Sequence, residues 1–327
     1  MVDIINRNNI DHFIVGSNEW LKIGYQELQE YVLAIQNEPT KKSLTGMAQQ
    51  FFRDLIRGEI TKSQKTVSFQ FLFYANQFGL ASVKRDYFEK ANFTIGKKEL
   101  KCMGRNKSLL EAHNLGELQL NLLTFVPLSL IMRDKEAQDF YANLELTYSK
   151  CPFYSVASNF LFSKLFYLIC SGDIMVLKEH ITFLITFEEN EYQKRRLDGG
   201  RGYSENDFKE NNFSIYSSAH SAMLYEGEQI EYLKLPFLKV LKSIFEKDEV
   251  NFNKNLLIAL EKHKTYYGTF LIEGEEINDR PEGWVSLWLT CACAIAHDKG
   301  MKREVTSDYI PEWLVKGEFE GLELVVE

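Results

Sequence analysis

The sequence contains few residues that stiffen, cross-link or anchor a chain. Only 6 of the 327 residues are proline and 19 are glycine, which excludes collagen-like, proline-rich and linker-dominated architectures. The 5 cysteines are scattered and include no CxxC pair, so we expect reduced thiols, with neither a disulfide framework nor a zinc site. The most apolar windows, residues 160–170 and 284–296, are shorter than the ~20 residues that a membrane span needs.

The chain also lacks the short motifs that usually mark an active site. Its 6 histidines stand alone, and neither HExxH nor GxSxG occurs. The glycines of residues 198–202 follow no strand pattern, so a flexible turn fits them better than a phosphate loop. The nearby basic residues of 194–201 lie between acidic runs, as in a solvated loop of mixed charge. We expect no enzyme, no cofactor and no metal; an enzyme whose residues converge only in the fold stays an alternative.

What the sequence does contain is apolar and aromatic bulk with a net negative charge. Apolar residues make up 45% and charged residues 26%, as in a globular protein, and 24 Phe, 16 Tyr and 4 Trp predict a large core. The 38 basic and 46 acidic residues leave a formal charge of −8. That charge disfavours nucleic acid and anionic membranes as partners and favours a basic protein. No basic and then apolar leader opens the chain, so we predict a cytoplasmic location.

Apolar residues recur at helical spacing along most of the chain. We predict an all-α fold, a multi-helix bundle of antiparallel helix pairs with at most a minor hairpin or edge strand. Residues 66–74 are predicted as helix, residues 92–100 as a hairpin or a loop, and residues 322–326 as one edge strand. Ser17 and Asp173 are the expected N-caps of two helices. The apolar positions that carry the pattern are Trp20, Ile23, Leu28, Tyr31 and Ile35; Ala48, Phe51, Phe52 and Leu55; Ala137, Phe140, Tyr141, Leu144 and Tyr148; Ile174, Leu177, Ile181, Leu184 and Ile185; Phe237, Val240, Leu241, Ile244 and Phe245, after Pro236; and Phe252, Leu256, Leu257 and Leu260.

One polar stretch interrupts this pattern. Residues 188–212 include very few apolar side chains, and we interpret them as a long polar loop between two helical subregions. The second subregion is small, and its most apolar helix needs a cover from elsewhere. Residues 1–327 are therefore predicted to form a single domain.

The most distinctive helix lies near the C-terminus. Asp279 is its expected cap and Pro281 its first turn, and residues 284–296 are apolar nearly all the way round. A helix of that kind belongs at the centre of a bundle, in contact with neighbours on several sides. Gly300 is expected to end it in a left-handed conformation, and Pro311 to open one final helical turn.

Three short stretches of this region carry a family resemblance. Residues 280–284 (RPEGW), 296–300 (AHDKG) and 304–311 (EVTSDYIP) resemble the immunity protein 49 family of bacterial polymorphic toxin systems. Larger or sulfur-containing side chains at Trp288, Cys291 and Cys293 depart from it. The resemblance implies a non-enzymatic antidote that binds the toxic domain of a secreted bacterial effector and blocks it. Many such toxins are nucleases with basic clefts, toward which an acidic partner would be steered.

Two acidic segments of the C-terminal part suit such a cleft, because tyrosine supplies contact area while carboxylates supply steering. We expect these side chains to be exposed. A solvated turn between helices is the alternative interpretation, and an α-helical adaptor or scaffold is the alternative function. The candidate partner-binding residues are Tyr225, Glu226, Glu228, Glu231, Tyr232, Glu273, Glu275, Glu276 and Asp279.

Overall fold

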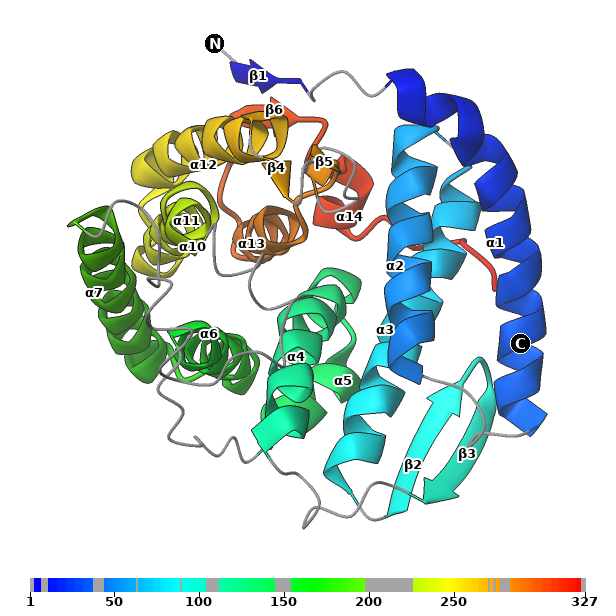
Figure 1. Ribbon diagram of the computed structural model, residues 1–327. Helices are drawn as coiled ribbons and strands as arrows, with labels where there is room; N and C mark the ends of the chain where they lie inside the picture. Colours follow the sequence, from blue (N-terminus) through cyan, green and yellow to red (C-terminus); the bar gives the residue numbers. More distant parts are fainter. Residues whose placement is uncertain are drawn as a thin grey trace.

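The computed structural model is mainly helical, which confirms the predicted all-α class (Figure 1). It describes residues 3–6, 11–37, 44–62, 64–88, 90–103, 112–144, 154–197, 226–269, 271–272, 275–276 and 283–324. The helices before the predicted polar loop are α1 (Asp11–Asn37), α2 (Leu44–Ile60), α3 (Lys65–Tyr87), α4 (Ala112–Met132), α5 (Lys135–Tyr141), α6 (Tyr154–Ser171) and α7 (Ile174–Leu197). The helices after it are α10 (Glu226–Gln229), the π-helix η3 (Ile230–Lys234), α11 (Leu235–Glu246), α12 (Glu249–Thr269), α13 (Leu287–Asp298) and α14 (Glu312–Lys316).

The described strands form three short pairs. β2 (Lys90–Ile95) and β3 (Lys98–Met103) make an antiparallel hairpin, so the hairpin alternative for residues 92–100 is confirmed. β4 (Leu271–Ile272) and β5 (Glu275–Glu276) form a second hairpin directly after α12. The edge strand predicted for residues 322–326 is not formed by residues 322–324, and the rest of it lies outside the described residues.

The two ends of the chain pack against different, distant segments. β1 (Asp3–Ile5) pairs in parallel with β6 (Val305–Ser307), at the top of Figure 1 beside α12, whereas the C-terminal segment returns to the side of α1 and α3. There the ring of Phe319 stacks on Phe69 at 5.7 Å, and the side-chain amide of Gln70 donates to the carbonyl of Glu323 at 2.5 Å. Each end therefore packs against a segment that is more than 240 residues away in the sequence.

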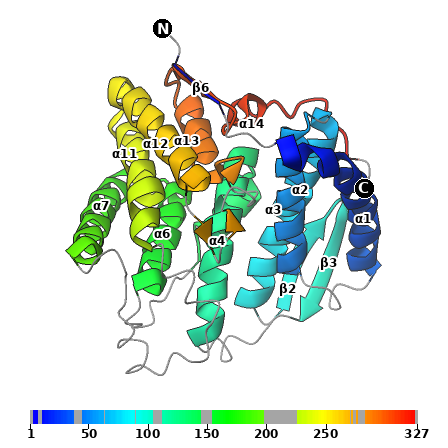
Figure 2. The same cartoon turned by 45° about the horizontal axis from the view of Figure 1, so that its top comes forward.

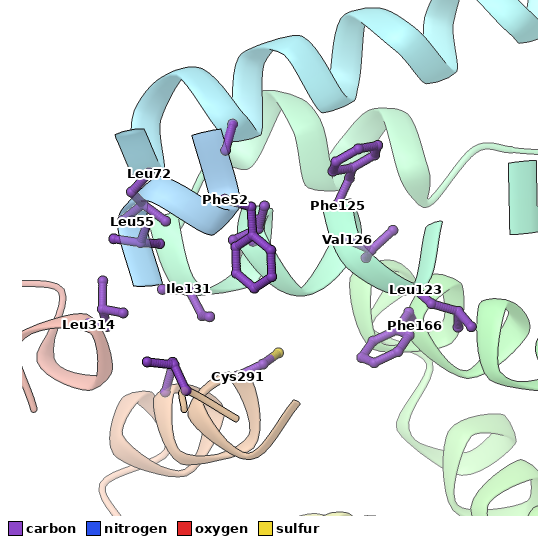
Figure 3. Close-up of a cluster of buried hydrophobic side chains, with 14 of the residues drawn as sticks. Phe52, Leu55, Leu72, Leu123, Phe125, Val126, Ile131, Phe166, Cys291 and Leu314 are labelled. Atoms are coloured by element: carbon purple, nitrogen blue, oxygen red, sulfur yellow. The ribbon is translucent and has the colours of Figure 1, made fainter. Parts of the chain in front are cut away.

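Helix α4 holds the central position. It packs against α3, α5, α6, α13 and α14, while α1 and α7 lie at opposite edges of the array (Figures 1 and 2). Buried side chains from α1 through α14 form one contiguous cluster. Figure 3 shows part of it, where Phe52 and Leu55 of α2 face Ile131 of α4, Cys291 of α13 and Leu314 of α14.

Several predicted helix ends differ from the observed ones. α1 begins at Asp11, so Ser17 lies inside the helix and the predicted N-cap there is wrong. The helix predicted around Ala137 ends at Tyr141. Asp173 does cap α7, because its carboxylate accepts a hydrogen bond from the amide of Val176 at 3.2 Å. The stop at Gly300 (φ 73°) and the short helix after Pro311 are also confirmed.

Helix α13 starts later than the expected cap at Asp279 and first turn at Pro281 predict. It begins at Leu287 after Ser286, whose amide donates to the carbonyl of Tyr309 at 2.9 Å. That bond joins the turn before α13 to the segment before α14. Trp284 therefore precedes the helix, and the predicted start is wrong. The expected cap and first turn, Asp279 and Pro281, lie outside the described residues.

The predicted polar loop is wrong in its first part. Residues 188–197 continue α7 to Leu197, and residues 198–212 lie outside the described residues. Glu188 is fully buried, and its carboxylate accepts a 2.6 Å hydrogen bond from the hydroxyl of Ser158 on α6. That hydroxyl in turn accepts a 2.9 Å bond from the ammonium of Lys234. Low local hydrophobicity was misleading here, because a buried carboxylate that is hydrogen-bonded this way can stay inside a helix bundle.

Pro236 lies inside a longer helical run than its position in the sequence indicates. The chain is helical without a break from Glu226 to Glu246, through the π-turn η3. The amide of Leu235 bonds the carbonyl of Ile230, five residues back. Because proline has no N–H and its ring displaces the carbonyl four residues earlier, a one-residue slip of the ladder accommodates it.

Candidate functional site

A cavity of about 440 Å³ lies between α2 and α4 on one side and η3, α11, α12 and α13 on the other. In both ribbon views the β4–β5 hairpin lies between α13 and α2 (Figures 1 and 2). Five aromatic rings from five elements line the cavity: Phe52, Tyr232, Phe237, Tyr267 and Trp288. Its size is within the range of small-molecule and side-chain sites, about 300–1,000 Å³.

The lining side chains differ in exposure, so that exposed ones mark the mouth of the cavity and buried ones its floor. Gln49 and Arg53 of α2 are exposed, whereas Phe237, Ala259 and Leu289 are buried. The described lining contains one formally charged side chain, that of Arg53. The cavity is therefore apolar in depth, with a cation at its entrance.

Trp288 is held firmly in the wall. Its indole N–H donates to the carbonyl of Leu123 on α4 at 3.0 Å. The ring stacks on Phe162 with centroids 5.1 Å apart, and Phe237 lies at the same centroid distance. Because the indole is fixed by both a hydrogen bond and ring contacts, the adjoining cavity has a rigid wall.

His263 is the histidine among the described lining residues. It is buried, and burial lowers the pKa of its imidazole to about 3, although a hydrogen bond to the backbone of Gly283 opposes that shift. The ring is therefore neutral near pH 7. Its Nε2 is buried and accepts no hydrogen bond, whereas the rings of Tyr267 and Tyr309 lie 4.7 and 4.9 Å from the imidazole.

Gly283 explains a residue of the RPEGW stretch. A Cβ at this position would stand 2.6 Å from the ring of Tyr267. Only glycine allows the tyrosine ring to lie against the backbone there, beside the carbonyl that His263 contacts. Gly283 thus shapes the wall of the cavity at Tyr267.

The predicted partner-binding residues are only partly accessible. Glu231 accepts a 2.5 Å hydrogen bond from the hydroxyl of Tyr192 on α7, and the ammonium of Lys262 lies 3.5 Å from its carboxylate. The same ammonium stands 5.3 Å from the ring centre of Tyr232. One carboxylate oxygen of Glu228 is buried. The predicted exposure is therefore only partial for Glu228 and Glu231, which are half-buried where α10 and η3 pack against α7 and α12.

The other predicted partner-binding residues lie at the start of α10, in β5 or outside the described residues. Glu226 begins α10, and Glu275 and Glu276 form β5 in a hairpin rather than at a helix end. The remaining three, Tyr225, Glu273 and Asp279, lie outside the described residues. Lys262 and the end of α12 are 7 residues apart, about 10 Å along a helix, so both acidic segments border the second half of α12.

The sequence interpretation missed His263 as a site residue, because it treated each histidine as isolated. One signal was present: His263 and Tyr267 are four residues apart and therefore share a helix face. The converging walls from α2 and α4 had no such signal, since nearly 140 residues of chain separate Leu123 from His263.

Metal and membrane sites find no support in the part of the chain that the structure describes. No group of three or more His, Cys, Asp or Glu residues there is placed to hold a metal ion. No described helix is long and apolar enough to cross a membrane. Cys291 and Cys293 are buried free thiols, and burial raises the pKa of Cys293 to about 11.

Comparison with known proteins supports the resemblance found in the sequence. Residues 209–314 match the family model for Immunity protein 49. The match includes η3, α11, α12 and α13, which form the C-terminal walls of the cavity, but neither α2 nor α4. No curated protein and no solved structure matches the chain.

Proposed function

We propose that this chain, whose residues 209–314 match the Immunity protein 49 family, is an immunity protein that binds a cognate bacterial toxin and blocks its toxic domain. The family match is the observation that carries this proposal. A protein of this kind acts as a stoichiometric, non-enzymatic inhibitor. It needs an interface of about 1,600 Å² with a few buried anchors rather than a catalytic constellation.

The surface charge supports a basic partner. The formal charge of −8 steers a cationic domain toward the chain, and nucleases are a class of toxin with such clefts. We place the interface around the cavity mouth and the two acidic segments, with Tyr225, Glu226, Glu228, Glu231, Tyr232, Glu273, Glu275, Glu276 and Asp279 as contributors. Among them, Glu231 acts through its contacts with Tyr192 and Lys262 as well as through its charge.

Co-expression tests the function directly. The chain is produced together with the C-terminal toxic domain of the effector encoded beside its gene, and survival and co-purification are scored. Protection with a stoichiometric complex is the expected result, and a toxic domain from an unrelated locus is the specificity control. Cell death with every toxic domain encoded beside the gene would overturn the proposal.

A pair of charge reversals tests the interface. Glu275→Lys with Glu276→Lys is expected to slow association at low salt, with a smaller effect at high salt, because rim charges act mainly on the association rate. Glu19→Lys with Glu30→Lys, two exposed positions on α1, makes the same change in net charge and is the matched control. Equal association rates for the two double variants would remove β5 from the interface.

A further inference from the structure

We propose that the outer edge of β3 is a docking site for an extended, acidic segment of another protein, which adds to the β2–β3 hairpin as a third strand. In strand addition, main-chain hydrogen bonds supply affinity and side-chain contacts supply specificity. The hairpin lies on the side of the molecule away from α12, which borders both acidic segments (Figure 1). The inference therefore goes beyond the proposed function and does not depend on it.

The register of the hairpin leaves one edge of β3 without main-chain partners. The two-residue turn at residues 96–97 makes Ile95 and Lys98 a hydrogen-bonded pair. Because such pairs alternate along an antiparallel ladder, the N–H and C=O groups of Glu99 and Lys101 point away from β2. Within the described part of the chain, no other backbone group bonds to those of Glu99 or Lys101 on that side. Two donors and two acceptors are therefore free to pair with an added strand.

The two strands of the hairpin differ in what lies beside them. β2 packs against α3, and its carbonyl at Ile95 also accepts a 2.9 Å hydrogen bond from the side-chain amide of Gln36 on α1. β3 packs extensively against β2 but against none of the other described elements. The side chains of Glu99 and Lys101 are exposed, whereas that of Leu100 between them is buried. β3 is thus anchored in the core on one face and accessible along its outer edge.

Lysine side chains define the chemistry of the segment that fits this edge. Residues 90–103 contain four lysines and one glutamate, hence a charge of +3, in a chain whose formal charge is −8. Lys97, Lys98 and Lys101 are exposed. Opposite charges that face one another on neighbouring strands stabilise the pairing. A strand with aspartate or glutamate at alternate positions therefore fits best.

A second copy of the chain is disfavoured as the occupant. Two copies paired through β3 would bring two basic hairpins together, and like charges directly opposite one another destabilise a strand pair. Lysine is also a residue with which natural proteins keep exposed edge strands from pairing indiscriminately. An acidic strand turns that repulsion into attraction, so the same lysines select one kind of partner.

Model peptides test the charge preference on the full chain. Three capped hexapeptides are titrated: one of alternating glutamate and valine, one of alternating lysine and valine, and the glutamate peptide with a central proline. The backbone amides of Glu99 and Lys101 are followed by NMR. The glutamate peptide is expected to bind at least about tenfold more tightly than the other two and to slow the hydrogen exchange of both amides. Equal binding of the three peptides, or no binding at millimolar concentration, overturns the inference.

Two proline variants locate the binding edge. Lys101→Pro removes an N–H that points away from β2, so the hydrogen bonds within the hairpin stay intact. Asn92→Pro makes the same change in the residue directly opposite, whose N–H points away from β3, and is the matched control. Lys101→Pro is expected to weaken binding of the glutamate peptide at least about tenfold, and Asn92→Pro to leave it unchanged. Equal effects of the two folded variants contradict docking at β3.

Charge variants keep the test independent of proline. Lys98→Glu with Lys101→Glu is expected to reverse the preference, so that the lysine peptide binds more tightly than the glutamate peptide. Lys22→Glu with Lys254→Glu makes the same change in net charge at exposed positions of α1 and α12, and is expected to keep the original preference. An unchanged preference in the first double variant overturns the inference. So does a dimer of the free chain that Lys101→Pro dissociates, because a second copy would then be the occupant.

Discussion

The two ends of α13 are packed in opposite ways. At the C-terminal end, Ala292, Cys293, Ala294 and Ala296 are buried with essentially no exposure, and Cys291 points toward the α4 side of the cluster in Figure 3. At the N-terminal end, residues 286–289 border a cavity of about 440 Å³. Cys293 and Ala296 also line a second cavity of about 300 Å³, whereas Ala292 and Ala294 line neither of the two, so the helix joins a packed face to a hollow one.

Side-chain size accounts for the difference. Alanine and cysteine let neighbouring helices approach closely and fill space evenly. Trp288 instead packs against Phe162 and Phe237 with ring centroids 5.1 Å apart, and large rigid rings keep α6, α11 and α13 from approaching as closely as small side chains allow. Tightly packed side chains and a cavity therefore occur within four turns of one helix.

The largest expected effect comes from the boundary between the two ends. Trp288→Asp removes the ring contacts and the 3.0 Å bond to the carbonyl of Leu123, and it places a charge beside an apolar cavity. We expect a loss of at least about 4 kcal/mol in the free energy of unfolding, or insoluble protein. Denaturant unfolding followed by far-UV circular dichroism measures it, with Trp288→Phe as the conservative control. A variant as stable as the parent would contradict the packing of Trp288 against α4, α6 and α11.

The packed end should not tolerate added volume. Ala292→Leu inserts three carbon atoms where the alanine is fully buried, and overpacking of this kind costs about 1–3 kcal/mol. Thermal and denaturant unfolding measure the loss. An unchanged midpoint would mean that the C-terminal end of α13 contains unfilled space.

The hollow end should produce a pH dependence. The pKa of His263 is about 3 in the folded chain and 6.5 in its ordinary state, so the unfolded chain binds the extra proton first and stability falls as the pH drops below about 7, toward 3. The loss attributable to this one residue is about 1.5 kcal/mol between pH 6.5 and 5. His263→Phe should lack it.

Unfolding free energies of the parent and of His263→Phe, compared at several pH values, isolate this residue because the other titrating groups cancel. The difference should grow in favour of the variant as the pH falls. Parallel curves would show that the imidazole is solvated in the folded chain.

The smallest expected effect completes the comparison. Ala259→Leu is the same substitution as Ala292→Leu, but its added atoms enter the cavity. We expect a change within about 1 kcal/mol, with stabilisation the favoured direction, because cavity filling commonly stabilises a protein. Denaturant unfolding of the two variants measures the difference in their free energies of unfolding. Equal losses in both would show that Ala259 and Ala292 are packed equally tightly.

The helices themselves were largely predictable, and their ends were not. Periodic apolar positions located α2, α7, α11 and α12, since a buried stripe needs the same 3–4 spacing whatever it packs against. Ser17 was misread as an N-cap because a serine that caps and a serine within a helix look alike in sequence. Glu188 was assigned to a loop, because its partner Ser158 is 30 residues away in the sequence and Lys234, which donates to that serine, is 46 residues away.

The sequence by itself determined the all-helical class, the apolar helix near the C-terminus, the stop at Gly300 and the family resemblance of residues 280–311, because each depends on residues close together in the chain. Tertiary structure alone decided the buried polar contact of Glu188, the hydrogen bond between Tyr192 and Glu231, and the cavity lined by His263. The cavity exists only where α2 and α4 meet η3, α12 and α13. Local spacing carries no information about contacts between segments so distant in sequence, since these depend on how whole helices pack.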